Sequence, residues 1–235
     1  MRKMIIASTS TLHGSGYLNY LLEELTFFLK DTDTILFIPY ARPGGISYED
    51  YTKKVHGAFS AIGKTVKGIH EFNTPKEALK NAKAIFVGGG NTFVLVNQLY
   101  RNDLISTLQE VIRSGTPYLG TSAGSNICGL TMNTTNDMPI VYPPSFKTLA
   151  VVPFNINPHY LDPDPRSKHM GETRETRIQE FHAFNSQPVI GLREGSWLYV
   201  NGDRIVLKGE LDARIFEYNK SSYEVNTGTD LSGLK

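Results

Sequence analysis

The chain has 235 residues, enough to bury a full core, and this length predicts a single catalytic domain that spans residues 1–235. Lys and Arg number 24, Asp and Glu 23, and like charges do not cluster, so neither nucleic acid nor an anionic membrane is an expected partner. The apolar run Met4–Ala7 is too short for a signal peptide, and no later segment approaches a membrane span. We expect a cytoplasmic protein with a small partner, and the single cysteine, Cys128, fits a reducing compartment.

Five short apolar runs in the first half predict strands that are covered on both faces, as in a parallel sheet. These runs are Met4–Ala7, Ile35–Ile38, Thr65–Ile69, Ala84–Val87 and Tyr118–Leu119. Apolar stripes at helical spacing lie between them and begin at Leu18, Val55 and Leu104. Repeated βα units predict an α/β fold, a doubly wound and mostly parallel sheet with helices on both faces, with ligands beyond the C-terminal strand ends.

The second half of the chain has a different pattern. Residues 131–172 are rich in Pro, Asn, Asp and Thr and predict a long loop region that helps to build a site, with one strand-like run at Leu149–Val152. A helix at about Arg174–Ala183 and a strand at Val189–Leu192 follow. The remaining runs predict antiparallel C-terminal hairpins that close the sheet edge: Trp197–Val200, Arg204–Leu207 and Ala213–Tyr218.

A G-x-S-x-G segment, Gly120 to Gly124, directly follows one apolar run and precedes an expected helix from Ala123 to Leu130. A serine at such a strand-to-helix elbow is held exposed in a strained turn, and small neighbours let the backbone double back. The context predicts that Ser122 is a nucleophile. The alternative is that Ser122 only caps the helix.

The segment Gly88-Gly89-Gly90-Asn91 ends another apolar run and precedes an expected helix, Thr92–Tyr100. Backbone N–H groups at such a helix start can bind anions. If Gly89 or Gly90 lies beside the elbow, its N–H and that of Ala123 would form an oxyanion hole. A tight turn and a nucleotide-phosphate loop are the alternatives, although the lysine of a P-loop is missing.

A serine nucleophile needs a base, and six histidines compete for this role: His13, His56, His70, His159, His169 and His182. His56 and His182 lie on expected helices, where a solvated or half-buried role is the simpler interpretation. His159 lies in the loop region, and Pro158 fixes the backbone before it. We therefore predict that His159 is the base.

The residue that orients the imidazole is not decided by spacing, because Asp162, Asp164, Glu172 and Glu194 all qualify. Glu194 follows an expected strand, so it would stand at a strand end, although it also reads as a solvated turn residue. His159, Asp162 and Asp164 could instead hold a metal, but a ligand set with recognisable spacing is missing. We predict no metal and no cofactor.

Several motifs in one order resemble the aspartyl dipeptidases, the peptidase E family of serine peptidases. They are Ser8–Thr11, Phe86–Phe93, the elbow, Thr134–Val141, Ile156–His159, Gly171–Arg174 and Gly191–Gly195. The resemblance implies a Ser-His-Glu triad on a sheet like that of class I glutamine amidotransferases. It also implies activity on dipeptides that begin with L-aspartate.

By the positions that match the family's motifs, the resemblance implies that Ser122 is the nucleophile, His159 the general base and Glu194 the residue that orients His159. Arg174 matches the family's arginine for the substrate's aspartate side chain, and a guanidinium can pair bidentately with a carboxylate. Asp137 matches a family aspartate, which we interpret as the anion for the substrate's free ammonium. The alternative is that Asp137 orders the long loop.

The expected partners are small peptides with an N-terminal Asp, and a homodimer is compatible with the sequence. A hydrolase of the same fold that acts on isoaspartyl peptides or poly-aspartate is an alternative. So is a non-catalytic binder of acidic metabolites, which would need no activated serine.

Overall fold

The computed structural model describes residues 1–166, 168 and 170–235. The first half contains β1 (Lys3–Ala7), α1 (Leu22–Phe28), β2 (Thr34–Ile38), α2 (Tyr48–Ser60), β3 (Thr65–Gly68), α3 (Pro75–Lys80), β4 (Ile85–Val87), α4 (Thr92–Arg101), α5 (Ile105–Ser114), β5 (Tyr118–Thr121) and α6 (Ala123–Asn126). The second half contains β6 (Asn155–Pro158), α7 (Arg174–His182), β7 (Val189–Leu192), β8 (Ser196–Asn201), β9 (Arg204–Gly209), β10 (Ala213–Phe216) and β11 (Tyr223–Val225). Short 3-10 helices, η1 (Asn19–Leu21) and η2 (Ile69–Glu71), precede α1 and follow β3. Within the described part of the chain, no helix is long and apolar enough to cross a membrane.

The larger sheet has seven strands in the order β3-β2-β4-β5-β1-β8-β9. The first five are parallel, as predicted, and β8 and β9 add an antiparallel hairpin beside β1. Ala7 lies opposite Thr121, and Val87 lies opposite Gly120, so the C-terminal ends of β1, β4 and β5 meet at one edge. This shared edge is where a doubly wound sheet binds its ligands.

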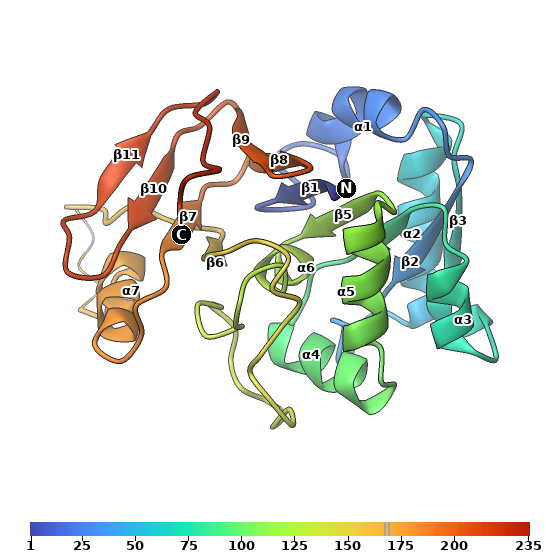
Figure 1. Cartoon of the computed structure of the whole chain (residues 1–235), viewed down its shortest axis with the longest axis horizontal. Helices are drawn as coiled ribbons and strands as arrows, with labels where there is room; N and C mark the ends of the chain where they lie inside the picture. Colours follow the sequence, from blue (N-terminus) through green and yellow to red (C-terminus); the bar gives the residue numbers. More distant parts are fainter. Residues whose placement is uncertain (167, 169) are drawn as a thin grey trace.

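Helices cover both faces of this sheet. Successive side chains of a strand point to opposite faces, and because those on both faces are apolar, each face is packed against helices. On β1, Ile5 packs with the cluster that contains Leu25 of α1 and Val55 of α2. Ile6 packs instead with the cluster that contains Leu95 of α4 and residues of α5. The predicted α/β, doubly wound architecture is confirmed (Figure 1).

A second sheet, in the order β11-β10-β7-β6, lies beside the first with α7 against it (Figure 1). A small core of Tyr160, Ile178, Val189 and Phe216 joins α7 to β7 and β10. The prediction that the C-terminal hairpins close one sheet edge is thus correct for β8 and β9 but wrong for the run from Ala213. That run pairs with β7 because both strands bury apolar residues against α7.

Two local predictions are wrong. Leu149–Val152 is mostly buried, with Ala150 partly exposed, but it is not a strand, because its N–H groups donate to carbonyls of the turn at residues 127–129 instead of to a neighbouring strand. The helix after Ser122 ends at Asn126 and not at Leu130, since those same carbonyls are used by the loop. The loop region also contains β6, and α3 adds a helix that the apolar pattern did not indicate.

Candidate active site

Ser122 occupies the elbow between β5 and α6. Its φ of 54° and ψ of −112° are strained for a residue with a side chain. Its backbone N–H donates to Ala7 O at 3.2 Å, which ties the elbow to the end of β1. The Ser122 side chain makes no capping hydrogen bond to α6, so the capping interpretation is wrong. The hydroxyl stands half-buried at the shared strand edge.

The small neighbours of Ser122 are required by space. A Cβ at Gly124 would lie 2.2 Å from Val87 O, and one at Gly120 would lie 2.5 Å from Gly124 O. The Ser125 hydroxyl lies 2.6 Å from Ala7 O and 2.8 Å from Gly120 O, and the Tyr118 hydroxyl donates to Gly124 O at 2.6 Å. These contacts hold the elbow in its strained conformation.

The glycine loop after β4 lies directly against the elbow. A Cβ at Gly89 would lie 2.9 Å from Ser122 Cβ and 3.4 Å from Ser122 Oγ. Gly90 has a φ of 144°, and a Cβ there would lie 2.3 Å from Ala41 O. Among the described residues, the N–H groups of Gly89, Gly90 and Ala123 have no acceptor. Their position fits an oxyanion hole.

The phosphate-loop alternative does not fit, because the start of α4 already holds a carboxylate from this chain. Asp137 Oδ2 accepts from Thr92 N–H at 2.7 Å, from Thr92 Oγ1 at 2.6 Å and from Thr135 Oγ1 at 3.0 Å. Asn91 caps the same helix through Val94 N–H at 3.1 Å. Asp137 therefore orders the long loop with one of its oxygens, which is the alternative role given above.

His159 and Glu194 are paired. The distance from His159 Nδ1 to Glu194 Oε1 is 2.6 Å, and the two side chains are 35% and 44% exposed. The backbone N–H of His159 donates to Ser8 Oγ at 2.8 Å, and the Ser8 hydroxyl donates to Leu192 O at 2.7 Å. The structure thus brings together the base and the acid that the family resemblance implies.

The backbone N–H groups of Ser122 and His159 bind two consecutive residues: Ala7, the last residue of β1, and Ser8 after it. Ser122 N–H binds Ala7 O, and His159 N–H binds the side chain of Ser8. In the described part of the chain, the Ser122 hydroxyl and the His159 ring share no direct hydrogen bond. Such contacts are often loose without substrate and tighten when it binds.

The competing histidines have other surroundings. His56 Nδ1 accepts from Val66 N–H at 3.2 Å, and His182 Nε2 lies 2.9 Å from Gln187 O. Both roles are structural, as expected for residues on helices. His13 is exposed, and His70 is partly buried with its ring 5.7 Å from that of Tyr48, whereas His169 lies outside the described residues.

The competing carboxylates are paired with arginines. Asp162 binds Arg193 at 2.7 Å, Asp164 lies 3.5 Å from Arg166, and Glu172 lies 3.6 Å from Arg177. Only Glu194 of the four pairs with His159. Among the residues that the structure describes, no group of three or more His, Cys, Asp or Glu is arranged to hold a metal.

Arg174 begins α7 and lines an open pocket of about 540 Å³. The wall of this pocket also carries three carboxylates, Asp162, Asp164 and Glu172, each paired with another arginine as described above. Burial lowers the pKa of its guanidinium, Arg177 lowers it further, and Asp137 opposes both effects. Within the described residues, no carboxylate lies within 4.0 Å of Arg174. A half-buried cation without a carboxylate partner suits an anionic ligand.

Ser8 and Asn136 are the contributors that sequence reasoning missed. The buried hydroxyl of Ser8 joins the ends of β1, β6 and β7, as described above. Asn136 Nδ2 donates to Pro158 O at 2.7 Å and so fixes the peptide before His159. Both residues fall inside the motifs of the family resemblance, which is the only sequence signal that marks them.

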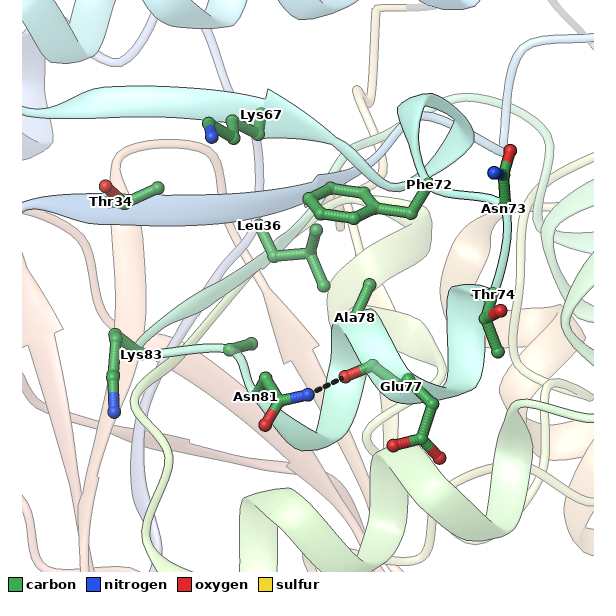
Figure 2. A pocket seen from close by; sticks show the side chains of 11 residues that line it. Thr34, Leu36, Lys67, Phe72, Asn73, Thr74, Glu77, Ala78, Asn81 and Lys83 are labelled. Carbon is green, nitrogen blue, oxygen red and sulfur yellow. Dashed lines mark hydrogen bonds between the residues drawn. The ribbon is translucent and has the colours of Figure 1, made fainter.

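Another pocket, of about 510 Å³, lies away from these residues, between helix α3 and the strands β2 and β3, of which β3 is the edge strand (Figure 2). Figure 2 shows Leu36, Phe72 and Ala78 in its wall and the hydrogen bond from Asn81 Nδ2 to Glu77 O, at 2.8 Å. None of the candidate catalytic residues lines this pocket, so it has no part in the site at the strand edge.

Several features of the fold and the site are those expected of a serine peptidase: a strained serine at a strand-to-helix elbow, amides without an acceptor among the described residues beside it, and a histidine–glutamate pair that is linked through Ser8 to the end of β1. The model of peptidase family S51 matches residues 4–208, and the chain belongs to this family. A "Peptidase E" from Streptomyces coelicolor is 51% identical over 231 residues, which are 98% of this chain and 94% of that protein.

A protein of Drosophila melanogaster described as "Probable alpha-aspartyl dipeptidase" is 44% identical over 236 residues, with 99% of this chain and 97% of that protein covered. The crystal structure of a peptidase from an acI-B1 Actinobacterium has the same fold, with a TM-score of 0.72 and 17% identity over 98% of this chain and 96% of that one. An enzyme, and not a non-catalytic binder, is therefore the correct interpretation.

Proposed function

We propose that this serine peptidase is a dipeptidase that releases N-terminal L-aspartate from Asp-X dipeptides through a Ser122–His159–Glu194 triad. The observation that carries the proposal is the 2.6 Å contact between His159 and Glu194, together with the backbone link from His159 to Ser8, the residue after the one whose carbonyl binds Ser122 N–H. The description of the Drosophila relative as a probable alpha-aspartyl dipeptidase supports the substrate class.

The proposed reaction is acyl transfer in two steps. His159 takes the proton of Ser122 Oγ as that oxygen attacks the carbonyl carbon of the Asp-X bond. The amides of Gly89, Gly90 and Ala123 stabilise the oxyanion, and His159 then protonates the leaving amine as the C–N bond breaks. Water, deprotonated by His159, attacks the acyl ester, frees aspartate and restores the serine.

Specificity is proposed to come from two fixed charges. The side-chain carboxylate of the substrate would pair with Arg174, which is half-buried and lacks a carboxylate partner among the described residues. The free ammonium would approach Asp137, whose Oδ1 is not used by the contacts that hold the loop. A site with such partners rejects substrates that leave them unpaired.

The test is a substrate panel for kcat/KM: Asp-Leu, Ala-Leu, isoaspartyl-Leu and N-acetyl-Asp-Leu. We expect Asp-Leu to be hydrolysed fastest and the Ser122→Ala variant to be inactive with all four. Arg174→Ala should lose about 10- to 150-fold with Asp-Leu, the equivalent of one charged hydrogen bond of roughly 1.5–3 kcal/mol. Its loss with Ala-Leu should be small.

Arg204→Ala is the matched control, because Arg204 is an exposed arginine paired with Asp230 at 3.4 Å and lies outside the site. It should leave the whole panel unchanged. An equal loss by Arg174→Ala on every substrate would assign Arg174 a structural role, and a preference for the isoaspartyl peptide would replace the proposed substrate class.

We further propose that the enzyme works in the cytoplasm. Its one cysteine, Cys128, is a buried free thiol, which is compatible with a reducing compartment.

A further inference from the structure

The glycine loop beside Ser122 is held at its two ends by backbone hydrogen bonds. Gly88 N–H donates to Ile38 O at 3.3 Å, and Asn91 N–H donates to Ala41 O at 2.7 Å. Between these anchors the Gly89–Gly90 peptide has no backbone partner among the described residues. Because glycine dihedrals are soft, this peptide needs another contact to fix its plane.

Tyr51 of α2 supplies that contact. Its hydroxyl donates to Gly89 O at 3.2 Å, and both groups are buried. The side chain is only 1% exposed, and its ring meets Phe37 edge-on at a centroid distance of 4.9 Å. Arg42 lies over the same ring, with Cζ 5.1 Å from the centroid. The hydroxyl is therefore held at a fixed point below the loop.

The loop sequence is built around this hydroxyl. A Cβ at Gly88 would lie 2.6 Å from the Tyr51 oxygen and 2.9 Å from the Phe37 ring, so only glycine leaves room for the phenol. Gly89 approaches Ser122 on its other side, as described above. The first glycine of the loop thus accommodates Tyr51, and the second accommodates the nucleophile.

Tyr17 lies next to this hydrogen bond and can supply a donor to the Tyr51 oxygen. Its hydroxyl lies 3.4 Å from that of Tyr51, and burial, followed by the neighbouring Tyr51, raises its pKa well above the usual range. A protonated Tyr17 can donate to Tyr51, whose single proton is then used for Gly89 O. The two phenols form a chain that ends on the loop carbonyl.

We propose that Tyr51 is a positioning residue for catalysis, which holds the Gly89–Gly90 peptide so that the Gly90 N–H faces the oxyanion. In a planar trans peptide, the C=O and the following N–H point in opposite directions. A donor that fixes Gly89 O therefore also fixes the direction of the Gly90 N–H. This inference deepens the proposed function and rests on its serine mechanism.

The test is Tyr51→Phe, which removes one oxygen and keeps the ring packing. Losing an oxyanion donor outright costs on the order of 100- to 1,000-fold, and here the donor remains but can rotate, so we expect kcat to fall about 10-fold or more. KM for Asp-Leu should stay within about twofold, because the loss acts on the transition state.

Tyr100→Phe is the matched control, because it also removes a tyrosine hydroxyl bonded to a backbone carbonyl, that of Lys147 at 2.9 Å, outside the site. It should match the unmodified enzyme. A second readout is the rate and final extent of Ser122 labelling by a fluorophosphonate, which does not depend on a preference for aspartate. Slow but complete labelling of Tyr51→Phe supports the positioning role.

Normal rates of turnover and labelling in Tyr51→Phe would overturn the inference. A normal labelling rate with a reduced final extent would also overturn it, because that result shows that part of the variant is misfolded. Failure of the proposed function looks different. If the unmodified enzyme does not take up the label at all, the serine mechanism is wrong, and if it is labelled but ignores Asp-Leu, only the substrate class is wrong.

Discussion

Replacing Glu194 by Gln tests the charge that the site directs at His159. The change keeps the shape of the side chain and removes its negative charge from a contact of 2.6 Å. During the reaction His159 becomes an imidazolium, and a carboxylate beside it stabilises that charge. The amide of Gln also favours a different imidazole tautomer, so both effects slow the reaction.

The size of the effect follows from the geometry. Two unit charges at 2.6 Å attract by about 2 kcal/mol at the dielectric constant of water and by about 6 kcal/mol at an effective value of 20. The two side chains are 35% and 44% exposed, which places the pair near the weaker limit, at about 2–3 kcal/mol. This predicts that kcat falls by about 30- to 150-fold.

The assay is steady-state hydrolysis of Asp-Leu, with thermal unfolding measured in parallel. Glu217→Gln is the control: it removes an acidic group paired with Lys220 at 2.8 Å and should leave kcat unchanged. If Glu194→Gln keeps kcat within about threefold of the unmodified enzyme, the charge of Glu194 does not act on His159, and the reasoning is refuted.

Three further outcomes are expected. Gly89→Ala should reduce turnover at least 10-fold with little loss of binding, since its Cβ would lie 2.9 Å from Ser122 Cβ; normal kcat would contradict this. Burial raises the pKa of Cys128 to about 12, so iodoacetamide at pH 8.5 should modify it only after denaturation. The hydrogen bond from Arg193 lowers the pKa of Asp162. The pair therefore stabilises the folded state at pH values above the ordinary pKa of an aspartate, and this stabilisation is lost as the pH falls through the lowered pKa. Arg193 also pairs with Glu224 at 2.8 Å and lowers the pKa of that carboxyl, so Arg193→Met should flatten the fall in melting temperature on acidification through both pairs, and an unchanged acid profile would exclude them as its cause.

The sequence by itself determined the features that depend on neighbouring residues. Runs such as Ile35–Ile38 are apolar on both faces, and that alone predicts strands buried in a parallel sheet. The elbow could be predicted because its requirement for small residues around Ser122 acts over only a few positions, and Gly120 and Gly124 satisfy it.

Only the tertiary structure decided which distant groups meet. Four carboxylates could have oriented His159, and Glu194 is distinguished because arginines pair with Asp162 and the other two. Strand partners were equally hidden: the run from Ala213 has the pattern of any edge strand, yet it pairs with β7 because α7 covers both. Pairing between strands and between charges depends on contacts far apart in the chain, and local pattern carries no information on which partner is closest in space.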